Sequence, residues 1–503
     1  MNQIGTHIAS IAGLHLPPTV ALLLTIGFVA FLFRRDLREQ PNVTGALWLP
    51  FVWLLIGCSR NLSAWLAIFG VPLPGWSSYT ASLEEGSPLD ACFYFALIAA
   101  GVYVLSQRQI NLSQVFRKNI WLLAFLLYCF VAILWSDSPF VAFKRWIKIL
   151  GHPVMALILF TEPDFREAFT RLMKRSAYVL VPASVLVIKY YPEIGRRYDE
   201  WEGIPLIVGI AQGKNLLGAS SMLFGLFFFW LLLQTWRTER TRERRNELLV
   251  ITGFLIMILW LFKLAHSATA EICMLVGILA VFVVGRPFVN RRMIMFYLFA
   301  TVCVIIVAEL SFGISAYVLE FLHRDKTITG RTVLWADLLE VKINPIFGVG
   351  FESFWMGDRL EQLREGRPWQ PNEAHNGYLE IYLDLGLVGL SMFFALIVAT
   401  FGKIRRELLR HFEWGRFRLG FLLALLLHEL TEVSFRGPHP FWFIFYVIAI
   451  EYPNFRFTSL ESVSDHSSSE EEEMEVVRYP DEVRISADRA DSISEFGLHR
   501  DLT

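Results

Sequence analysis

The chain has 503 residues, of which 54% are hydrophobic, 15% aromatic and 18% charged, and its formal net charge is −1. Its mean hydropathy is +0.46, whereas soluble domains carry about 25% charged residues. Apolar runs close to the roughly 20 residues that a bilayer core requires recur along the chain. This composition excludes an ordinary soluble enzyme and predicts an all-α polytopic membrane protein.

Thirteen apolar segments are candidates for transmembrane helices, although the second, fifth and last are short or polar for a span. They lie at 17–33, 43–58, 91–106, 119–135, 145–160, 176–190, 214–235, 248–264, 267–284, 294–319, 384–402, 419–434 and 440–452. We therefore predict a membrane domain over residues 1–457, with one large loop at about 320–383 that contains short helices. Residues 458–503 begin with a run rich in Ser and Glu, and we expect them to form a disordered acidic tail.

The distribution of basic residues orients these spans, because Lys and Arg gather in cytoplasmic connections. Basic clusters follow every odd-numbered span from the first to the eleventh, at 34–38, 108–118, 166–175, 237–245, 286–292 and 403–418. We expect these connections and the C-terminal tail in the cytoplasm, and the N-terminus outside. Four polar segments then fall on the outer side and form one site there if they converge, at 136–144, 191–213, 265–267 and 320–383.

The segment from Gly330 to Gly389 is the most informative, because it is a polar interruption that carries both an Arg and a His. His375 lies where the loop meets the eleventh span, and helical spacing would place Tyr378 on its face. A neutral imidazole at this interface can act as a general base toward a hydroxyl. The alternative is a His that only hydrogen-bonds the loop.

Arg331 begins the stretch RTVLWADLLEV, in which Leu residues recur at helical spacing. We therefore expect Arg331 at the start of a short helix, where its fork of donors suits a phosphate oxyanion. The helix N-terminus adds to the affinity for an anion. The alternative is an interfacial Arg that reaches lipid headgroups.

Further cations lie at the outer ends of the seventh and fifth spans. Lys214 and Asn215 follow Gln212 at the mouth of the seventh span, and Arg145 and Lys148 share a helical face of the fifth. Lys214 is a candidate phosphate contact, although lysines also anchor helices at headgroup level. Lys148 lies deep enough to be costly unless it lines a cavity.

Acidic residues are scattered along the large loop without a tight group that includes His or Cys. We therefore predict no metal site and no cofactor. A pair of carboxylates for glycoside hydrolysis is not excluded by the spacing, but nothing in the spacing selects a pair.

Taken in order, six motifs resemble those of the O-antigen ligase/polymerase superfamily of bacterial membrane glycosyltransferases. They cover roughly residues 130 to 390 and read WSDSPFVAFKRW, GIAQGKNLLG, HSATA, GRTVLW, NPIFGVGFESFW and AHNGYLEIYLDLGLVGL. Each motif alone is loose, and the ordered set is more specific. The sequences GKNLLG and GRTVLW are more similar to those of exopolysaccharide polymerases in this superfamily.

This resemblance implies a metal-independent glycosyltransferase in the bacterial inner membrane. Such an enzyme would transfer glycan from a polyprenyl-diphosphate carrier, such as undecaprenyl diphosphate, to a sugar hydroxyl at the periplasmic face. His375, of the His375–Asn376 pair, would be the base, and Arg331 would hold the diphosphate leaving group. The expected partners are the lipid-linked glycan, an acceptor glycan or glycolipid, membrane lipids and a chain-length regulator, and not nucleic acid.

The chain departs from the family pattern at Ala268, where ligases carry an Arg after the Ser. The second cation on the diphosphate must then come from elsewhere, and Lys214 is the first candidate, with Arg145 and Lys148 behind it. The leading hypothesis is a polymerase of surface polysaccharide or exopolysaccharide repeat units. The alternatives are a ligase that attaches finished glycan to lipid A core or another acceptor, and a transporter or flippase of lipid-linked oligosaccharides. A transporter would carry charged residues deep in several spans and inverted repeats in its sequence. We see few such charges and no repeat.

Overall fold

The computed structural model describes residues 16–71, 86–198, 203, 205–312, 331–365 and 371–453. The chain divides into two compact units, Met1–Phe455 and Arg456–Thr503. The described residues all belong to the first unit. The predicted acidic tail at 458–503 and the parts of the large loop at 320–330 and 366–370 lie outside them.

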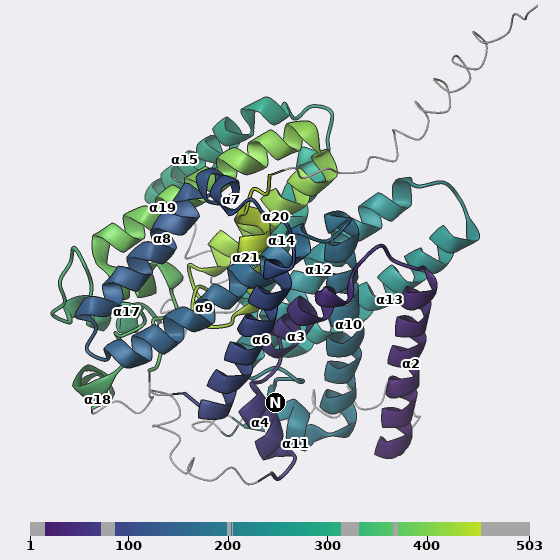
Figure 1. Ribbon diagram of the computed structural model, residues 1–503, viewed down its shortest axis with the longest axis horizontal. Coiled ribbons are helices and arrows are strands. Elements are labelled where there is room, and N and C mark those ends of the chain that lie inside the picture. The colour runs from purple at the N-terminus through teal and green to yellow at the C-terminus, as the bar shows by residue number, and fades with distance from the viewer. Residues whose placement is uncertain are drawn as a thin grey trace, which may run out of the picture. The chain divides into compact units, whose positions relative to one another are not determined.

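The described residues confirm an all-α membrane protein (Figure 1). The first helices are α2 (Pro18–Arg38), η2 (Gly45–Leu47), α3 (Trp48–Gly57), α4 (Leu62–Ile68), α6 (Pro88–Ser106), α7 (Leu112–Lys118), α8 (Ile120–Val131), η3 (Ala132–Trp135), α9 (Pro139–Phe160), α10 (Phe165–Tyr190) and α11 (Pro192–Gly195). The later ones are α12 (Lys214–Arg237), α13 (Arg242–Ala265), α14 (Ala268–Val284), η4 (Arg291–Met293), α15 (Ile294–Phe312), α17 (Arg331–Glu340), α18 (Gly357–Arg364), α19 (Gly377–Arg410), α20 (Phe412–His428) and α21 (Pro440–Ala449). Between α11 and α12, strands β1 (Arg196–Tyr198) and β2 (Pro205–Ile207) pair antiparallel, with Arg196 opposite Ile207.

Every predicted span overlaps a helix, but the number of membrane crossings stays a prediction. Within the described ranges, five helical segments are long and apolar enough to cross a bilayer: α6, α12, α13, Arg291–Glu309 and α19. The total rises to seven if two bent pairs each count as one span, α3 with α4 and α7 with α8. The twelfth predicted span, 419–434, is too long, because α20 ends at His428 and an irregular segment follows.

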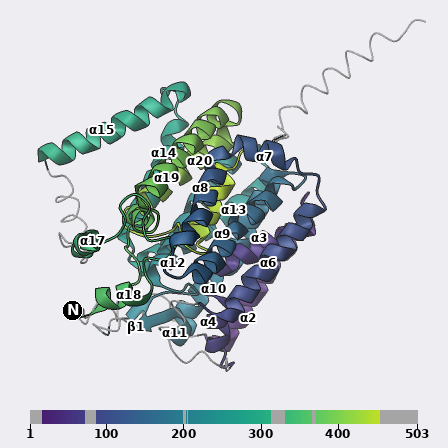
Figure 2. The same cartoon turned by 60° about the vertical axis from the view of Figure 1, so that its left-hand side comes forward.

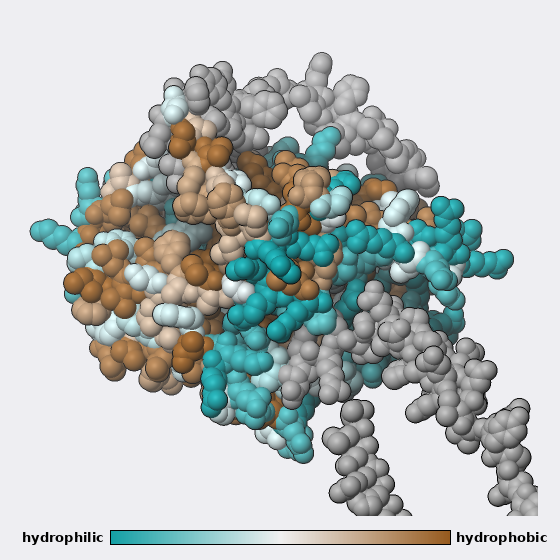
Figure 3. Space-filling view, turned by 90° about the horizontal axis from the view of Figure 1, so that it is seen from above, coloured by the Kyte–Doolittle hydropathy of each residue, from teal (hydrophilic) through white to brown (hydrophobic). Residues whose placement is uncertain are grey.

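Apolar side chains cover the outside of several helices, as contact with lipid requires. Leu23 on α2, Leu134 in η3 and Phe299 on α15 are 67%, 82% and 68% exposed. The short elements α4, α11, α17 and α18 lie at one end of the long helices, whereas α7 lies at the other (Figures 1 and 2). Figure 3 looks onto the end with α7 and shows polar side chains gathered beside apolar ones.

The large loop has a small hydrophobic core of its own. Buried side chains from α17, α18 and the segment between them pack together with residues near the start of α19: Leu334, Leu338, Val349, Phe354, Trp355, Leu360, Leu363, Ala374 and Leu383. The predicted short helices are therefore present in the described part of this loop. Burial of this apolar surface orders a segment that would otherwise be mobile.

Gly386 opens the helix α19 and lets the large loop dock onto it. Its φ of 65° and ψ of −167° are not helical. The segment 345–350 runs along this break, with hydrogen bonds from Leu387 N to Pro345 O (2.9 Å) and from Gly350 N to Asp384 O (2.9 Å). A Cβ on Gly386 would lie 2.3 Å from the backbone of Ile346, so only glycine fits.

We expect the Gly386→Ala substitution to detach this loop from α19. This combination of φ and ψ is essentially restricted to glycine and costs another residue roughly 1–3 kcal/mol, and the contact with Ile346 adds to that cost. Heating in detergent should show a lowered Tm, and proteolysis should show faster cleavage in 341–350. Gly402→Ala is the matched control, because Gly402 lies on the same helix with nothing within 4 Å of its Cβ position. Equal Tm values for the two variants would contradict this role of Gly386.

Candidate active site

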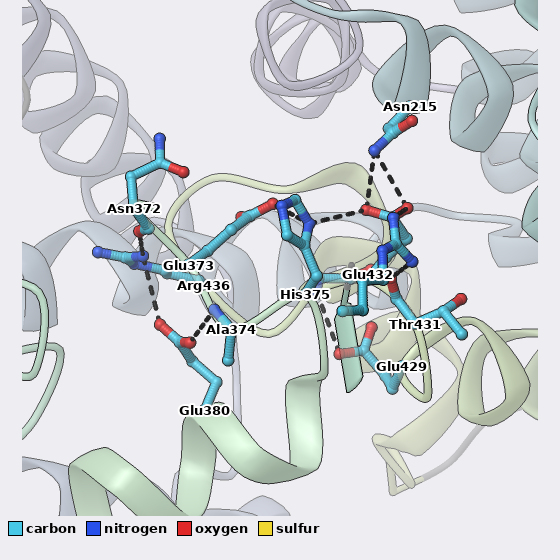
Figure 4. Close-up of polar contacts among 12 residues, drawn as sticks. Asn215, Asn372, Glu373, Ala374, His375, Glu380, Glu429, Thr431, Glu432 and Arg436 are labelled. Atoms are coloured by element: carbon cyan, nitrogen blue, oxygen red, sulfur yellow. Dashed lines mark hydrogen bonds and ion pairs between the residues drawn. The ribbon is translucent and has the colours of Figure 1, made fainter. Parts of the chain in front are cut away.

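Four segments that are far apart in sequence meet around one carboxylate, that of Glu432. They are the first residue of α17, the turn before α19, the start of α12 and the irregular segment 429–439 between α20 and α21 (Figure 4). Because each end of a helix leaves unsatisfied backbone groups, such a junction is suited to polar contacts. Of the four segments that the charge pattern placed on one side of the membrane, 320–383 supplies Arg331 and His375, and Asn215 lies two residues after the end of 191–213.

His375 lies in a turn and not on the helix that follows. Its φ is 49°, and α19 begins only at Gly377, with the side chain of Asn376 accepting hydrogen bonds from the backbone of Tyr378 (3.1 Å) and Leu379 (3.0 Å). The predicted helical face shared by His375 and Tyr378 is therefore wrong. Left-handed backbone at a residue other than glycine is strained and is held by its surroundings, often at functional sites.

Gly377 fixes this turn against the segment after α20. Its backbone N donates to the carbonyl oxygens of Glu429 (2.8 Å) and Glu432 (3.1 Å). A Cβ at this position would lie 1.9 Å from Oε2 of Glu429. The glycine after the His–Asn pair is thus required by close approach to a buried glutamate.

Glu432 connects the groups of the site. Its Oε1 accepts a hydrogen bond from Nη2 of Arg331 (2.7 Å), and both its oxygens lie within 3.1 Å of Nδ2 of Asn215. Arg331 also donates to the carbonyl of Thr431. Nδ1 of His375 lies 3.7 Å from Oε2 of Glu432 and 2.9 Å from Oε1 of Glu373 (Figure 4).

The close carboxylates determine the charge of His375. Burial disfavours its imidazolium, but the contacts with Glu373 and Glu432 outweigh burial and raise the pKa of His375 to about 9. Burial acts against the charged form of Glu432 too, yet His375 and Arg331 lower the pKa of Glu432 to about 2. At neutral pH the site therefore holds an imidazolium and a guanidinium on either side of an ionised carboxylate.

The expectation that no acidic residues gather around a His is wrong. Glu373, His375 and Glu432 place ligand atoms within 4.8 Å of one another. A divalent cation takes such donors. However, Glu432 already binds Arg331 and Asn215, so an ion would have to displace their donors and compete with the positive charge of Arg331.

The other predicted residues are divided between this site and its neighbourhood. Arg331 is the first residue of α17, as expected. Lys214 begins α12 with an exposed side chain and forms no ion pair with a residue that the structure describes, although its neighbour Asn215 binds Glu432. The hydroxyl of Tyr378 donates to the carbonyl of Leu426 (2.8 Å), which makes Tyr378 a packing residue in this structure.

Arg145 and Lys148 belong to a second polar group and do not contact His375. Arg145 donates to the backbone carbonyl of Glu352 and lies 3.9 Å from its carboxylate. The ammonium of Lys148 lies over the ring of Tyr94, 5.3 Å from its centroid.

This second group supports the turn of His375 through Arg436. Nη1 of Arg436 donates to the carbonyl of Asn372 (3.1 Å) and to Oε1 of Glu380 (3.3 Å). The other oxygen of Glu380 accepts from the backbone N of Ala374 (2.9 Å), the residue before His375. Arg436 and Glu380 thereby hold both sides of the loop that leads into the strained turn.

Sequence reasoning missed the segment 429–436, which supplies Glu432, Glu429 and Arg436. These residues were counted within or beside an apolar span, although ionisable residues in such a span are by default functional candidates. Glu429 is fully buried, with its Oε1 lacking a hydrogen-bond partner among the described residues. The sequence HELTE (428–432), at the end of an apolar run, could have indicated these residues.

Comparison with known proteins shows which family this chain resembles. Residues 251–394 match a family model described as O-antigen ligase. The predicted resemblance to the O-antigen ligase superfamily is thereby confirmed. The match includes Arg331 and His375 and ends before Glu432.

Two relatives with descriptive names support this result. The chain is 27% identical to "Exopolysaccharide production protein ExoQ" of Rhizobium meliloti (strain 1021) over 306 residues, which cover 58% of this chain and 67% of the relative. It is 22% identical to a "Putative polysaccharide ligase" of Rickettsia felis (strain ATCC VR-1525 / URRWXCal2) over 330 residues, 62% of this chain and 75% of the relative. This O-antigen ligase-like chain is therefore a multi-pass membrane protein of polysaccharide biosynthesis.

We expect Gly377→Ala to displace Glu429 and the turn of His375 together, because its Cβ would overlap Oε2 of Glu429. The substitution should abolish glycan transfer while the protein stays folded in detergent. Gly402→Ala is the matched control on the same helix, since nothing lies within 4 Å of its Cβ position. Full activity of Gly377→Ala would contradict the tight approach at this position.

Proposed function

We propose that this chain, an enzyme of the O-antigen ligase/polymerase type, transfers glycan from a polyprenyl-diphosphate carrier to a sugar hydroxyl at the periplasmic face of the inner membrane. The observation that carries the proposal is the junction of Arg331, His375 and Glu432. It combines a cation for a diphosphate with a titratable group for a hydroxyl proton. Both Arg331 and His375 lie in the part of the chain that matches the family.

The reaction is a single displacement at the anomeric carbon. The acceptor oxygen attacks that carbon as the bond to the diphosphate breaks, and the diphosphate leaves with the electron pair. The proton of the acceptor passes to His375. Arg331 stabilises the charge that grows on the leaving oxygen, and such fixed cations contribute strongly in a site with little water. Inversion of the anomeric configuration follows.

Glu432 positions these two groups. It binds Arg331 on one oxygen and lies beside His375 on the other. Its negative charge orients the imidazole and favours the imidazolium that forms when the acceptor proton is taken. This arrangement has the logic of a base oriented by a third group.

The polymerase is the form of this reaction that the relatives favour. The relative with the higher identity is named as an exopolysaccharide production protein, and the other is named as a putative polysaccharide ligase. We propose that the chain joins repeat units by moving the growing glycan onto a new lipid-linked unit, with a chain-length regulator as partner. In cells that lose this protein, lipid-linked repeat units without long glycan support polymerase, and long lipid-linked polymer supports ligase.

The argument from charge against a transporter is weaker than the sequence suggested. The structure buries Asp384 and Glu432, which fall within two of the predicted spans, so ionisable residues inside spans are not rare here. They pair with groups of the protein: Asp384 accepts from the backbone N of Ser353 (3.0 Å), and Glu432 accepts from Arg331. Such pairing is what a structural charge requires, and transfer remains the better proposal.

We expect His375→Ala and Arg331→Ala each to lower transfer in purified form by at least about 100-fold. General base catalysis contributes about 10²- to 10⁴-fold, and a fixed donor to a growing charge about as much. The assay is transfer from a polyprenyl-diphosphate-linked repeat unit in detergent, with Arg410→Ala on the distant end of α19 as control. Full activity of both site variants would remove this mechanism.

Lys214 is the proposed second cation on the diphosphate, in place of the Arg that Ala268 replaces. Thr269, beside Ala268, bonds Thr431 (2.9 Å), so position 268 borders the same site. Lys214→Ala should raise KM for the donor about tenfold, whereas Lys189→Ala, at the exposed end of α10, should leave it unchanged. A wild-type KM in Lys214→Ala would point to Arg145 or Lys148 instead.

The charge state of His375 predicts the pH dependence. A base acts only when neutral, so activity should rise as pH rises through the pKa of His375, about 9. Glu373→Gln removes the first contact that raises this pKa, and the rising limb should shift to lower pH. Activity that falls with pH over the same range would show that His375 acts as a cation and not as a base.

Metal independence is part of the proposal. The group of Glu373, His375 and Glu432 is the place where an ion would bind. We expect undiminished transfer in the presence of EDTA. Loss of activity that is restored by a divalent cation would contradict this claim.

A further inference from the structure

An open pocket with both apolar and polar lining lies beside the docked loop. Its volume is about 720 Å³, within the roughly 300–1,000 Å³ typical of ligand pockets. Three parts of the chain line it: the end of η3 together with Asp137, the segment 342–349 before α18, and α18 itself. The lining residues are Trp135, Asp137, Lys342, Ile343, Asn344, Phe347, Gly348, Val349 and Arg359. We call it the loop pocket.

Two aromatic rings form the apolar wall of the loop pocket. Trp135 and Phe347 lie with ring centroids 5.9 Å apart at an interplanar angle of 63°, and the side chain of Phe347 is 46% exposed. The indole N–H of Trp135 donates to the carbonyl of Phe347 (3.2 Å). This bond satisfies the polar group of the indole and holds its ring in place, so the ring face is available for a ligand.

The rest of the lining of the loop pocket is polar, and the charges of Arg359 and Asp137 in it neutralise each other. Nη2 of Arg359 donates to Oδ2 of Asp137 (2.7 Å), and Arg359 also contacts the backbone carbonyls of Ser353 and Phe354 (both 3.4 Å). Asn344 and Lys342 add an amide and an ammonium group to the lining. Asp137 provides acceptors, and Arg359 and Lys342 provide donors.

We propose that the loop pocket binds a segment of the glycan outside the reacting sugar. A pyranose ring has an apolar C–H face, which packs on an aromatic ring, and hydroxyl groups that need both donors and acceptors. The loop pocket offers both. A lipid diphosphate fits less well, because Asp137 already neutralises Arg359 and Lys342 is the one other cation in the described lining for two or more negative charges.

The position of the loop pocket agrees with such a role, and the inference rests on the proposed function. The segment that lines it at Gly348 and Val349 continues to Glu352, whose carboxylate accepts from the backbone N of Gly437 (3.2 Å). Gly437 follows Arg436, which holds the turn of His375. The loop pocket is therefore linked through Glu352 and Arg436 to the segment that holds the turn of His375.

The test is binding, separate from catalysis. The probe is a set of fragments of one to four repeat units, made by partial acid hydrolysis of the surface polysaccharide of the host cells. We expect full-length protein in nanodiscs to bind the longer fragments, with Kd raised at least tenfold by Trp135→Ala and three- to tenfold by Asp137→Asn. Arg410→Ala, at the distant end of α19, should bind as wild type does.

Matched controls separate this pocket from an interfacial aromatic belt. Trp121, 46% exposed at the start of α8, lies outside the loop pocket, so Trp121→Ala should leave Kd unchanged. Wild-type Kd in both Trp135→Ala and Asp137→Asn, which is a surface change that leaves the fold intact, would overturn the inference. So would displacement of the fragments by phosphatidylglycerol in the nanodisc, which would identify a lipid headgroup site.

The two proposals fail in different ways. If fragments bind as expected but the wild-type protein transfers no glycan, the proposed function falls and the loop pocket remains a glycan site. If transfer occurs but the variants in the loop pocket bind as wild type does, only the inference falls.

Discussion

The site depends on one buried carboxylate that has to be paired. Glu432 is 7% exposed, and an ionised carboxylate at such a position is costly unless cations and hydrogen-bond donors surround it. The start of α17, the start of α12 and the turn before α19 each supply one of these partners. The requirement to satisfy Glu432 therefore holds together three segments that lie 57, 101 and 217 residues away from it along the chain.

The same pairing sets the electrostatics of the proposed chemistry. Arg331 would bring positive charge to a diphosphate, but Glu432 offsets it before any substrate binds. A substrate diphosphate has to compete with this carboxylate for the guanidinium. Part of the binding free energy is thus used to exchange one ion pair for another, which favours a transition state in which charge on the leaving group is growing.

Glycines allow the polar turns to approach the helices closely. Gly386 opens α19 so that the loop 345–350 lies in its break, and Gly377 lets the turn of His375 touch Glu429. Gly348 has a φ of +70°, and its Cβ would lie 2.4 Å from the backbone of Asp384. In a membrane helix, an opened turn is tolerated where other backbone groups satisfy it, and here the loop does so.

The amino-acid sequence determined the helical membrane class and the approximate limits of the helices, and it singled out Arg331 and His375 as candidate site residues. The length of an apolar run and the position of basic clusters are local properties of the sequence. Short motifs in a fixed order can also be compared with those of a family, so these features can be predicted from the sequence. Only the tertiary structure decided which side chains meet Glu432. Partners such as Asn215 lie more than two hundred residues away, and a glutamate at the end of an apolar run cannot be distinguished from a span residue by its neighbours. The charge of His375 was decided in the same way, because it depends on carboxylates that folding brings within a few ångströms.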